Sequence, residues 1–198
     1  MGLDLFDIEG QTPIDEDEKE DLLIKTISTR AELDEFEQVN VEKAIEWSLK
    51  KKFTTEKTLT EEFVKELHQR MFDDVWRWAG QFRTSNKNIG VDKFLINVEL
   101  KKLLEDCRFW IANKVFHKDE IAVRFSHRMV RIHPFANGNG RHSRLIADIL
   151  VSHELGQQHF SWGSRSLDKQ GEARKKYLLA LKEADDNDYR LLLQFSRE

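Results

Sequence analysis

Apolar residues recur at helical spacing over most of this chain. In the clearest case a repeat of three or four residues predicts a helix over about 61–78, carried by Phe63, Leu67, Met71, Val75 and Trp78. Gly80 then supplies a C-terminal stop. The same periodicity predicts further helices over about 30–51, 98–115, 119–132, 141–155, 167–183 and 186–195. The chain is therefore expected to be an all-α helical bundle.

The starts of two helices are marked by their polar residues. Thr29 precedes Glu32, and Thr58 precedes Glu61, by the three residues of a capping box. We expect an N-terminal helix at 29–52, which opens a domain of residues 29–198. Residues 1–28 are expected to form an acidic, partly ordered segment ahead of that domain.

Residues 81–97 interrupt the helical pattern. Polar residues and Gly90 separate two short apolar pieces, at 89–91 and 94–96. This alternation is typical of a loop or a short β-hairpin. We expect a small hairpin flap at 84–96.

Composition and charge narrow the class of protein. The 198 residues are 39% hydrophobic and 34% charged, a balance typical of one soluble domain. Residues 1–21 hold nine acids and one lysine, which leaves 31 bases and 27 acids in the rest and no basic stripe, so nucleic acid is an improbable partner. The single cysteine, Cys107, allows no internal disulfide. No membrane span or leader is visible, so we expect a cytoplasmic protein.

The chemically informative stretch runs from His133 to Arg144 and reads His-Pro-Phe-Ala-Asn-Gly-Asn-Gly-Arg-His-Ser-Arg. Pro134 disfavours helix at His133, so the imidazole is left at a helix end. The glycines of 137–140 tolerate left-handed conformations, so backbone N–H groups can form an anion nest just before a helix N-terminus. Arg141 and Arg144 project to one side of the first turn. The stretch predicts a triphosphate site beside a proton acceptor.

Simpler interpretations exist for each part. Asn-Gly pairs are common in turns, and His-Pro at a helix end is often only a cap. The two arginines in register outweigh these interpretations when the parts are taken together. His127 and His142 lack the spacing of a zinc site. We interpret His127 as a residue near the core, Cys107 as a buried apolar side chain and Phe135 as a buried anchor for the loop.

With these residues the segment resembles the Fic motif, His-x-Phe-x-Asp/Glu-Gly-Asn-Gly-Arg-x-x-Arg, at every fixed position except Asn137. Residues 76–83 and the polar segment after them resemble the flap region of the same Fic/Doc family. The resemblance covers most of 29–198 and extends to the bacterial subgroup called mobile mystery protein B. It implies a Fic fold, with a small β-hairpin flap at 84–96 and an active-site loop at 133–144.

The resemblance also implies an activity, that of an ATP-dependent protein adenylyltransferase. His133 would accept the proton of a Ser, Thr or Tyr hydroxyl of a target protein as that hydroxyl attacks the α-phosphorus of ATP. The nucleotide would be bound by Asn137, Gly138, Asn139, Gly140, Arg141 and Arg144. Transfer of UMP or of a phosphoryl group on the same scaffold, and a catalytically weak nucleotide-binding regulator, are the alternatives.

The implied cofactor is Mg²⁺ or Mn²⁺, and here the chain departs from the family. Most members have a metal-ligating carboxylate where this chain has Asn137. An amide oxygen coordinates without adding charge, so either metal affinity is weaker or the site has drifted from AMP transfer. The subgroup resemblance favours the first. The kinase branch of the family tends to have lysine where this chain has Gly140, which makes phosphoryl transfer the lesser option.

Regulation and partners are implied as well. Many family members carry an inhibitory helix with the pattern Ser/Thr-x-x-x-Glu-Gly/Asn, which survives here only in degraded form around Glu32 and Glu37. Glu32 already belongs to the capping box, so we expect Glu37 to restrain the enzyme by pairing with Arg144. The alternative is a solvated helix carboxylate. The expected partners are a target protein docked on the flap at 84–96 by strand addition, and an antitoxin or the inhibitory helix itself.

Overall fold

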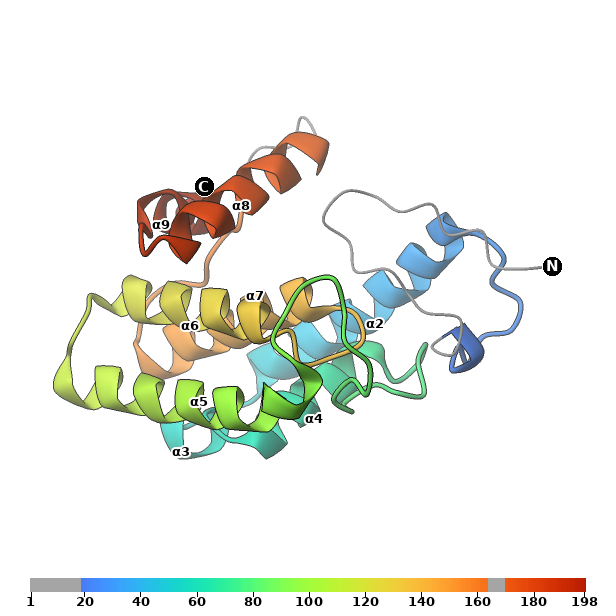
Figure 1. Cartoon of the computed structure of the whole chain (residues 1–198), viewed down its shortest axis with the longest axis horizontal. Coiled ribbons are helices and arrows are strands. Elements are labelled where there is room, and N and C mark those ends of the chain that lie inside the picture. Colours follow the sequence, from blue (N-terminus) through green and yellow to red (C-terminus); the bar gives the residue numbers. More distant parts are fainter. Residues whose placement is uncertain (1–18, 164–169) are drawn as a thin grey trace.

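A computed structural model describes residues 19–163 and 170–198 of the chain. Residues 1–18, and with them most of the predicted acidic segment, lie outside the described residues. The described part is helical, as predicted (Figure 1). Its elements are α2 (Arg30–Lys50), α3 (Thr55–Thr58), α4 (Glu61–Phe72), the 3-10 helix η1 (Lys93–Leu95), α5 (Ile96–Asn113), α6 (Lys118–Ile132), α7 (Asn139–Ile149), the π-helix η2 (Leu150–Glu154), α8 (Gln170–Asp185) and α9 (Arg190–Arg197).

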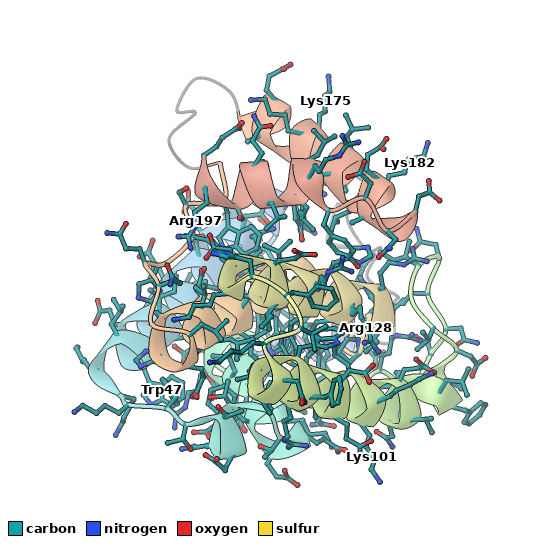
Figure 2. All side chains as sticks on the ribbon, turned by 90° about the vertical axis from the view of Figure 1, so that its left-hand side faces the viewer. Trp47, Lys101, Arg128, Lys175, Lys182 and Arg197 are labelled. Atoms are coloured by element: carbon teal, nitrogen blue, oxygen red, sulfur yellow. The ribbon has the colours of Figure 1, made fainter. Side chains whose placement is uncertain are left out.

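The helices α6 and α7 form the centre of the molecule. They pack against each other, with α5 and α9 against α6 and with α4 against α7. In Figure 1, α8 and α9 lie above this pair, and α3, α4 and α5 lie below it. Lys175 and Lys182 point outward from α8 (Figure 2). Because α6 runs directly into α7 through residues 133–138, the segment with the predicted chemistry lies at the joint between two buried helices.

The N-terminal helix begins as predicted. The backbone N–H of Glu32 donates to the Thr29 hydroxyl at 3.2 Å, and the N–H of Thr29 donates to the Glu32 carboxylate at 3.0 Å. The capping box predicted for α4 is wrong. Thr60, not Thr58, caps that helix, and its hydroxyl accepts from the N–H of Phe63 at 3.1 Å.

Helix α4 ends at Phe72, earlier than its apolar repeat predicted. Asn40 of α2 is the cause, because its side chain donates to the carbonyl of Arg70 at 3.1 Å and accepts from the N–H of Asp74 at 2.9 Å. These bonds satisfy backbone groups that a longer helix would use. The apolar residues after Phe72, including Trp76, are still buried. They therefore continue the apolar repeat of α4 in the sequence although they are not part of the helix.

The predicted hairpin at 84–96 is a loop. The described residues of this segment contain turns and the short η1 but no strand. This region pairs instead with the end of α6 and the start of the motif: Phe82, just before the loop, forms an isolated bridge with Phe135, and the N–H of Val91 donates to the carbonyl of Ile132 at 3.3 Å. Its conformation is therefore set by the motif segment rather than by a second strand of its own.

Candidate active site

His133 lies at the C-terminal end of α6 in a left-handed backbone conformation, with φ 54° and ψ 58°. The side chain is 3% exposed, and Nδ1 lies 3.3 Å from the carbonyl oxygen of Val130. Since a carbonyl oxygen only accepts, Nδ1 carries the proton and Nε2 carries the lone pair. The imidazole is thereby oriented as a base.

The protonation state of His133 agrees with that role. The pKa of His133 is lowered to about 4, chiefly by burial and in part by the positive charges of Arg83 and Lys87, against the raising effect of the Val130 carbonyl. The imidazole is therefore neutral at pH 7. A neutral histidine is the form that can accept a proton.

The loop after His133 is fixed by two side chains. Asn139 closes a pair of hydrogen bonds with the backbone of Phe135, accepting from its N–H at 2.9 Å and donating to its carbonyl at 2.8 Å. The fully buried ring of Phe135 stacks on His68 with 3.7 Å between ring centroids, which confirms its role as an anchor. His68 accepts from the N–H of Gly80 at Nδ1 and donates from Nε2 to the carbonyl of Asn137. No sequence pattern predicted this role of His68.

Glycine is required at position 138. Gly138 has φ 75°, and a Cβ built there would lie 2.4 Å from the ring of Phe72. Helix α7 begins directly after it, at Asn139, two residues earlier than predicted. The predicted nest is therefore a single left-handed glycine followed by the first turn of a helix. No acidic side chain lies in that turn, so its backbone N–H groups present a positive helix end to an anion.

Asn137 does not offer an open ligand for a divalent ion. Its side-chain oxygen already accepts from the N–H of Gly138 at 2.6 Å, and its Nδ2 is buried with no hydrogen-bond partner. An amide NH₂ group donates and cannot coordinate a cation. Among the described residues no group of three His, Cys, Asp or Glu side chains has metal-site geometry. This donor set does not fit a resident Mg²⁺ ion.

The two motif arginines are held by different neighbours. Arg141 donates from Nη2 to the carboxylate of Glu37 at 2.5 Å and lies over the ring of Phe72. The guanidinium of Arg144 lies 5.0 Å from the ring centroid of Tyr177 on α8. Both were predicted to reach the same phosphate-binding region, and both line the same cavity.

Glu37 is a buried anchor, not a solvated carboxylate. It is 0% exposed, and its second oxygen accepts from the indole N–H of Trp76 at 2.6 Å. The predicted partner was wrong: Glu37 pairs with Arg141, the first motif arginine, and not with Arg144. The register of α2 brings it to the start of α7, where Arg141 lies, while Arg144 is one turn further along beside α8.

These parts surround one cavity of about 830 Å³. The motif side is lined by His133, Asn137, Gly138, Asn139, Gly140, Arg141 and Arg144. The opposite side comes from α2 and α8, through residues that include Gln38, Val41, Tyr177 and Leu178. The volume is within the range of pockets that hold a nucleotide-sized molecule.

The cavity also contains a carboxyl group that sequence reasoning missed. Asp148 lies one turn after Arg144 on α7 and accepts from the indole N–H of Trp162 at 3.0 Å and the N–H of Phe160 at 3.2 Å. Burial raises the pKa of Asp148 to about 7, against the lowering effect of those two donors. Its i,i+4 spacing from Arg144 was the available signal, since it places both on one helix face.

The remaining candidates of the sequence are structural. His127 is buried, with Nε2 2.8 Å from Asp185 and Nδ1 3.1 Å from the Tyr189 hydroxyl, so it joins α6 to the C-terminal helices. His142 is also buried and donates from Nε2 to the carbonyl of Val64 at 3.0 Å. Burial raises the pKa of the Cys107 thiol to about 12, as expected for an inert core residue.

Comparison with known proteins agrees with the geometry. The model of the Fic/DOC family matches residues 58–151, which include most of the α4–α7 core and the whole motif. The protein adenylyltransferase Fic of Aedes aegypti is 29% identical over 136 residues, which make up 67% of this chain and 26% of that protein. The chain thus spans about a quarter of the length of this relative.

Solved structures share the fold. The N-terminal Fic domain of a VirB-translocated Bep effector protein from Bartonella quintana has a TM-score of 0.69 at 18% identity, over 88% of this chain and 84% of that one. BepC from Bartonella tribocorum, solved with bound AMPPNP, has a TM-score of 0.68 at 17% identity, over 91% and 95%. The assignment to the mobile mystery protein B subgroup stays a prediction. Residues 58–151, which include the motif at 133–144, thus match the Fic/DOC family, and the described residues share the fold of solved Fic domains.

Proposed function

We propose that this protein transfers AMP from ATP to a Ser, Thr or Tyr hydroxyl of a target protein. The observation that carries the proposal is the position of His133, whose buried neutral imidazole shares one cavity with the N-terminus of α7 and both motif arginines. A relative named protein adenylyltransferase supports the same reaction class.

In this reaction the target hydroxyl oxygen forms a bond to the α-phosphorus of ATP. The bond from that phosphorus to the oxygen bridging to the β-phosphate breaks, and pyrophosphate leaves. The hydroxyl proton passes to Nε2 of His133, while Nδ1 keeps its bond to the carbonyl of Val130 and so holds the ring in place. General-base catalysis of this kind contributes about 10²–10⁴ in rate.

The phosphates would lie at the first turn of α7, against backbone N–H groups of 138–140 and the guanidinium groups of Arg141 and Arg144. Two of these groups are engaged in the structure, the N–H of Gly138 by Asn137 and Arg141 by Glu37. The nucleotide therefore has to displace both contacts. The divalent ion enters as part of the substrate, as the magnesium or manganese complex of ATP.

Partners remain part of the proposal. The loop at 84–96 exposes apolar side chains near the active-site segment, with Phe94 81% and Leu95 49% exposed, which suits the docking of a target segment. The contact of α2 with Arg141 suits a self-inhibitory helix, and an antitoxin protein is the other proposed regulator. No helix of the described residues is long and apolar enough to cross a membrane.

The test is incubation with Mg²⁺ and ATP labelled in parallel at the α- or the γ-phosphate, followed by denaturing gels. Wild type, His133→Ala and Glu37→Gly are compared, with cell lysate as a source of targets. We expect protein-bound label from the α-position only, and its loss in His133→Ala while the Kd for ATP is unchanged.

The other outcomes separate the alternatives. Label retained from the γ-position means phosphoryl transfer. Label obtained only when UTP replaces ATP means UMP transfer. The absence of label from any donor, even with Glu37→Gly, favours a nucleotide-binding regulator, for which the loss of the family carboxylate at Asn137 is the specific observation.

A further inference from the structure

Arg83 is a buried guanidinium group at the junction between the loop and the motif. It is 5% exposed. Its Nε donates to the carbonyl of His133 at 2.7 Å, its Nη1 donates to the carbonyl of Ser85 at 2.8 Å, and its Nη2 donates to the carbonyl of Val91. One side chain therefore links the backbone of the proposed base to the loop on both of its sides, at Ser85 and at Val91.

The backbone around Arg83 makes the same junction. The N–H of Arg83 donates to the carbonyl of Pro134 at 2.9 Å. Gly90 of the loop packs closely against His133 and Arg83. A Cβ built at Gly90 would lie 2.6 Å from Cβ of His133 and 3.1 Å from Nη2 of Arg83. The loop and His133 are thus joined by several hydrogen bonds and by the close packing of Gly90.

His133 needs this support, because its left-handed backbone is costly for a residue with a Cβ. The planar fork of arginine reaches three carbonyl oxygens at once, which the single ammonium of lysine cannot do in a fixed geometry. The arrangement therefore requires arginine and not merely a positive charge.

We propose that Arg83 is a positioning residue for the AMP transfer proposed above, on which this inference rests: it locks the backbone of His133 to the loop at 84–91, so that the position of the base depends on the conformation of the loop. A target segment that binds the loop then contacts the same segment that fixes the position of His133. Neither the motif nor the cavity lining includes Arg83.

The charge of Arg83 has a second effect on the same histidine. Arg83, just before the loop, and Lys87, on the loop, are the cations whose charges lower the pKa of His133, while Arg141 and Arg144 of α7 line the same cavity as His133. Asp92 is the carboxylate whose charge acts on Arg83 in turn. Removing the guanidinium therefore raises the pKa of His133, whereas a lysine in its place keeps most of that effect.

The test uses the full chain with Arg83→Gln and Arg83→Lys. The matched control is Arg131→Gln, which removes an arginine two residues from His133 that is 60% exposed and paired with Asp185 at 3.2 Å. The pH titration of the His133 imidazole is followed by NMR without nucleotide, its signal being assigned by its loss in His133→Gln. AMP transfer and ATP affinity are measured in parallel.

For Arg83→Gln we expect the His133 titration to move to higher pH and kcat to fall about 100-fold, the cost of a base misplaced by about 1 Å, with the Kd for ATP unchanged. Arg83→Lys leaves the titration near its wild-type position but still loses kcat. If Arg83→Gln does not fold, Arg83→Lys decides the question. The control changes none of these values.

A folded Arg83→Gln protein with wild-type kcat and an unshifted His133 titration overturns the inference, as does Arg83→Lys with full activity. If the wild type transfers no AMP, the proposed function fails. The NMR signals of His133 in the variants then still show whether Arg83 holds the base residue.

Discussion

At the scale of single residues, the site depends on side chains that form hydrogen bonds with the backbone of the motif segment. Asn139 pairs with the backbone of Phe135, His68 holds the carbonyl of Asn137, and Arg83 holds the carbonyl of His133. Each buried polar group thereby satisfies a loop carbonyl that a helix or strand would otherwise satisfy. The backbone of the motif segment is therefore held by side chains at several points, although it lies in a loop.

Asn137 gives the sharpest prediction about the metal. In Asn137→Asp a carboxylate replaces the amide, adding the negative charge and the hard oxygen ligands that Mg²⁺ prefers. We expect the Mg²⁺ concentration for half-maximal AMP transfer to fall by at least about 10-fold, since even the loss of an outer-shell partner of a metal ligand changes metal affinity by about 10- to 100-fold. Measuring transfer against Mg²⁺ at fixed ATP checks this.

The control for that experiment is Asn88→Asp, the same substitution at an exposed position of the loop. It changes the net charge equally and is expected to leave the Mg²⁺ dependence as it is. An Asn137→Asp protein with the wild-type Mg²⁺ requirement would mean that a carboxylate at position 137 does not reach the metal ion of the bound nucleotide.

At the scale of elements, the sequence predicted best where a helix end is set locally. The capping box at Thr29 and Pro134 after α6 are adjacent in sequence to the ends they determine, and α2 and α6 begin and end within one residue of their predicted bounds. The end of α4 was missed because Asn40, about 30 residues away, determines it. The hairpin was missed because the backbone of this segment pairs with Ile132 and Pro134, while the two sides of the loop are joined through side chains such as Asn86.

The same distinction holds for the site. The motif placed His133 and both arginines at one cavity, since they lie within twelve consecutive residues, between the end of α6 and the first turns of α7. Arg83 and the partner of Glu37 depend on contacts across 50 and 104 residues of sequence, respectively. The spacing of apolar residues along the chain carries no information about contacts between residues so far apart in sequence.

Asp148 makes the stability of the α7 region depend on pH. The folded state holds its proton up to about pH 7, whereas the unfolded chain loses it near 3.8, so this stabilisation is present at low pH and is lost as the pH rises through 7. Asp148→Asn keeps an acceptor oxygen and removes the titration. From pH 5 to pH 8 we expect the Tm of wild type to fall by several degrees relative to this variant.

Thermal unfolding of both proteins at the two pH values measures this difference directly. Comparing the two proteins also cancels the opposite pH effect of the buried His133, which both contain. Parallel Tm curves for the two proteins would mean that folding does not raise the pKa of Asp148.

At the scale of the whole molecule, α2 connects the N-terminal part of the chain to the motif. Glu37→Gly frees Arg141 and removes the partner of the buried Trp76 indole. We expect auto-modification to rise at least about 10-fold, since hydrogen bonds to charged groups contribute about 1.5–3 kcal/mol, and Tm to fall by several degrees. Transfer of α-label and thermal unfolding measure the two effects.

Glu35→Gly is the matched control. It places glycine in the same helix at an exposed position and carries the same helix-propensity cost of about 1 kcal/mol. Only the Glu37 variant should gain activity. Equal auto-modification in both variants and in wild type would mean that the Glu37–Arg141 pair is structural alone.

The Glu37–Arg141 contact also has a thermodynamic consequence. If ATP and Glu37 compete for one guanidinium group, the coupling between them is reciprocal. A change that weakens the contact of α2 with Arg141 then strengthens ATP binding, and the two equilibria change by the same factor. Conversely, cellular ATP, by occupying Arg141, makes the N-terminal helix easier to detach, so the chain reports nucleotide concentration through the exposure of a segment about a hundred residues away from the motif in sequence.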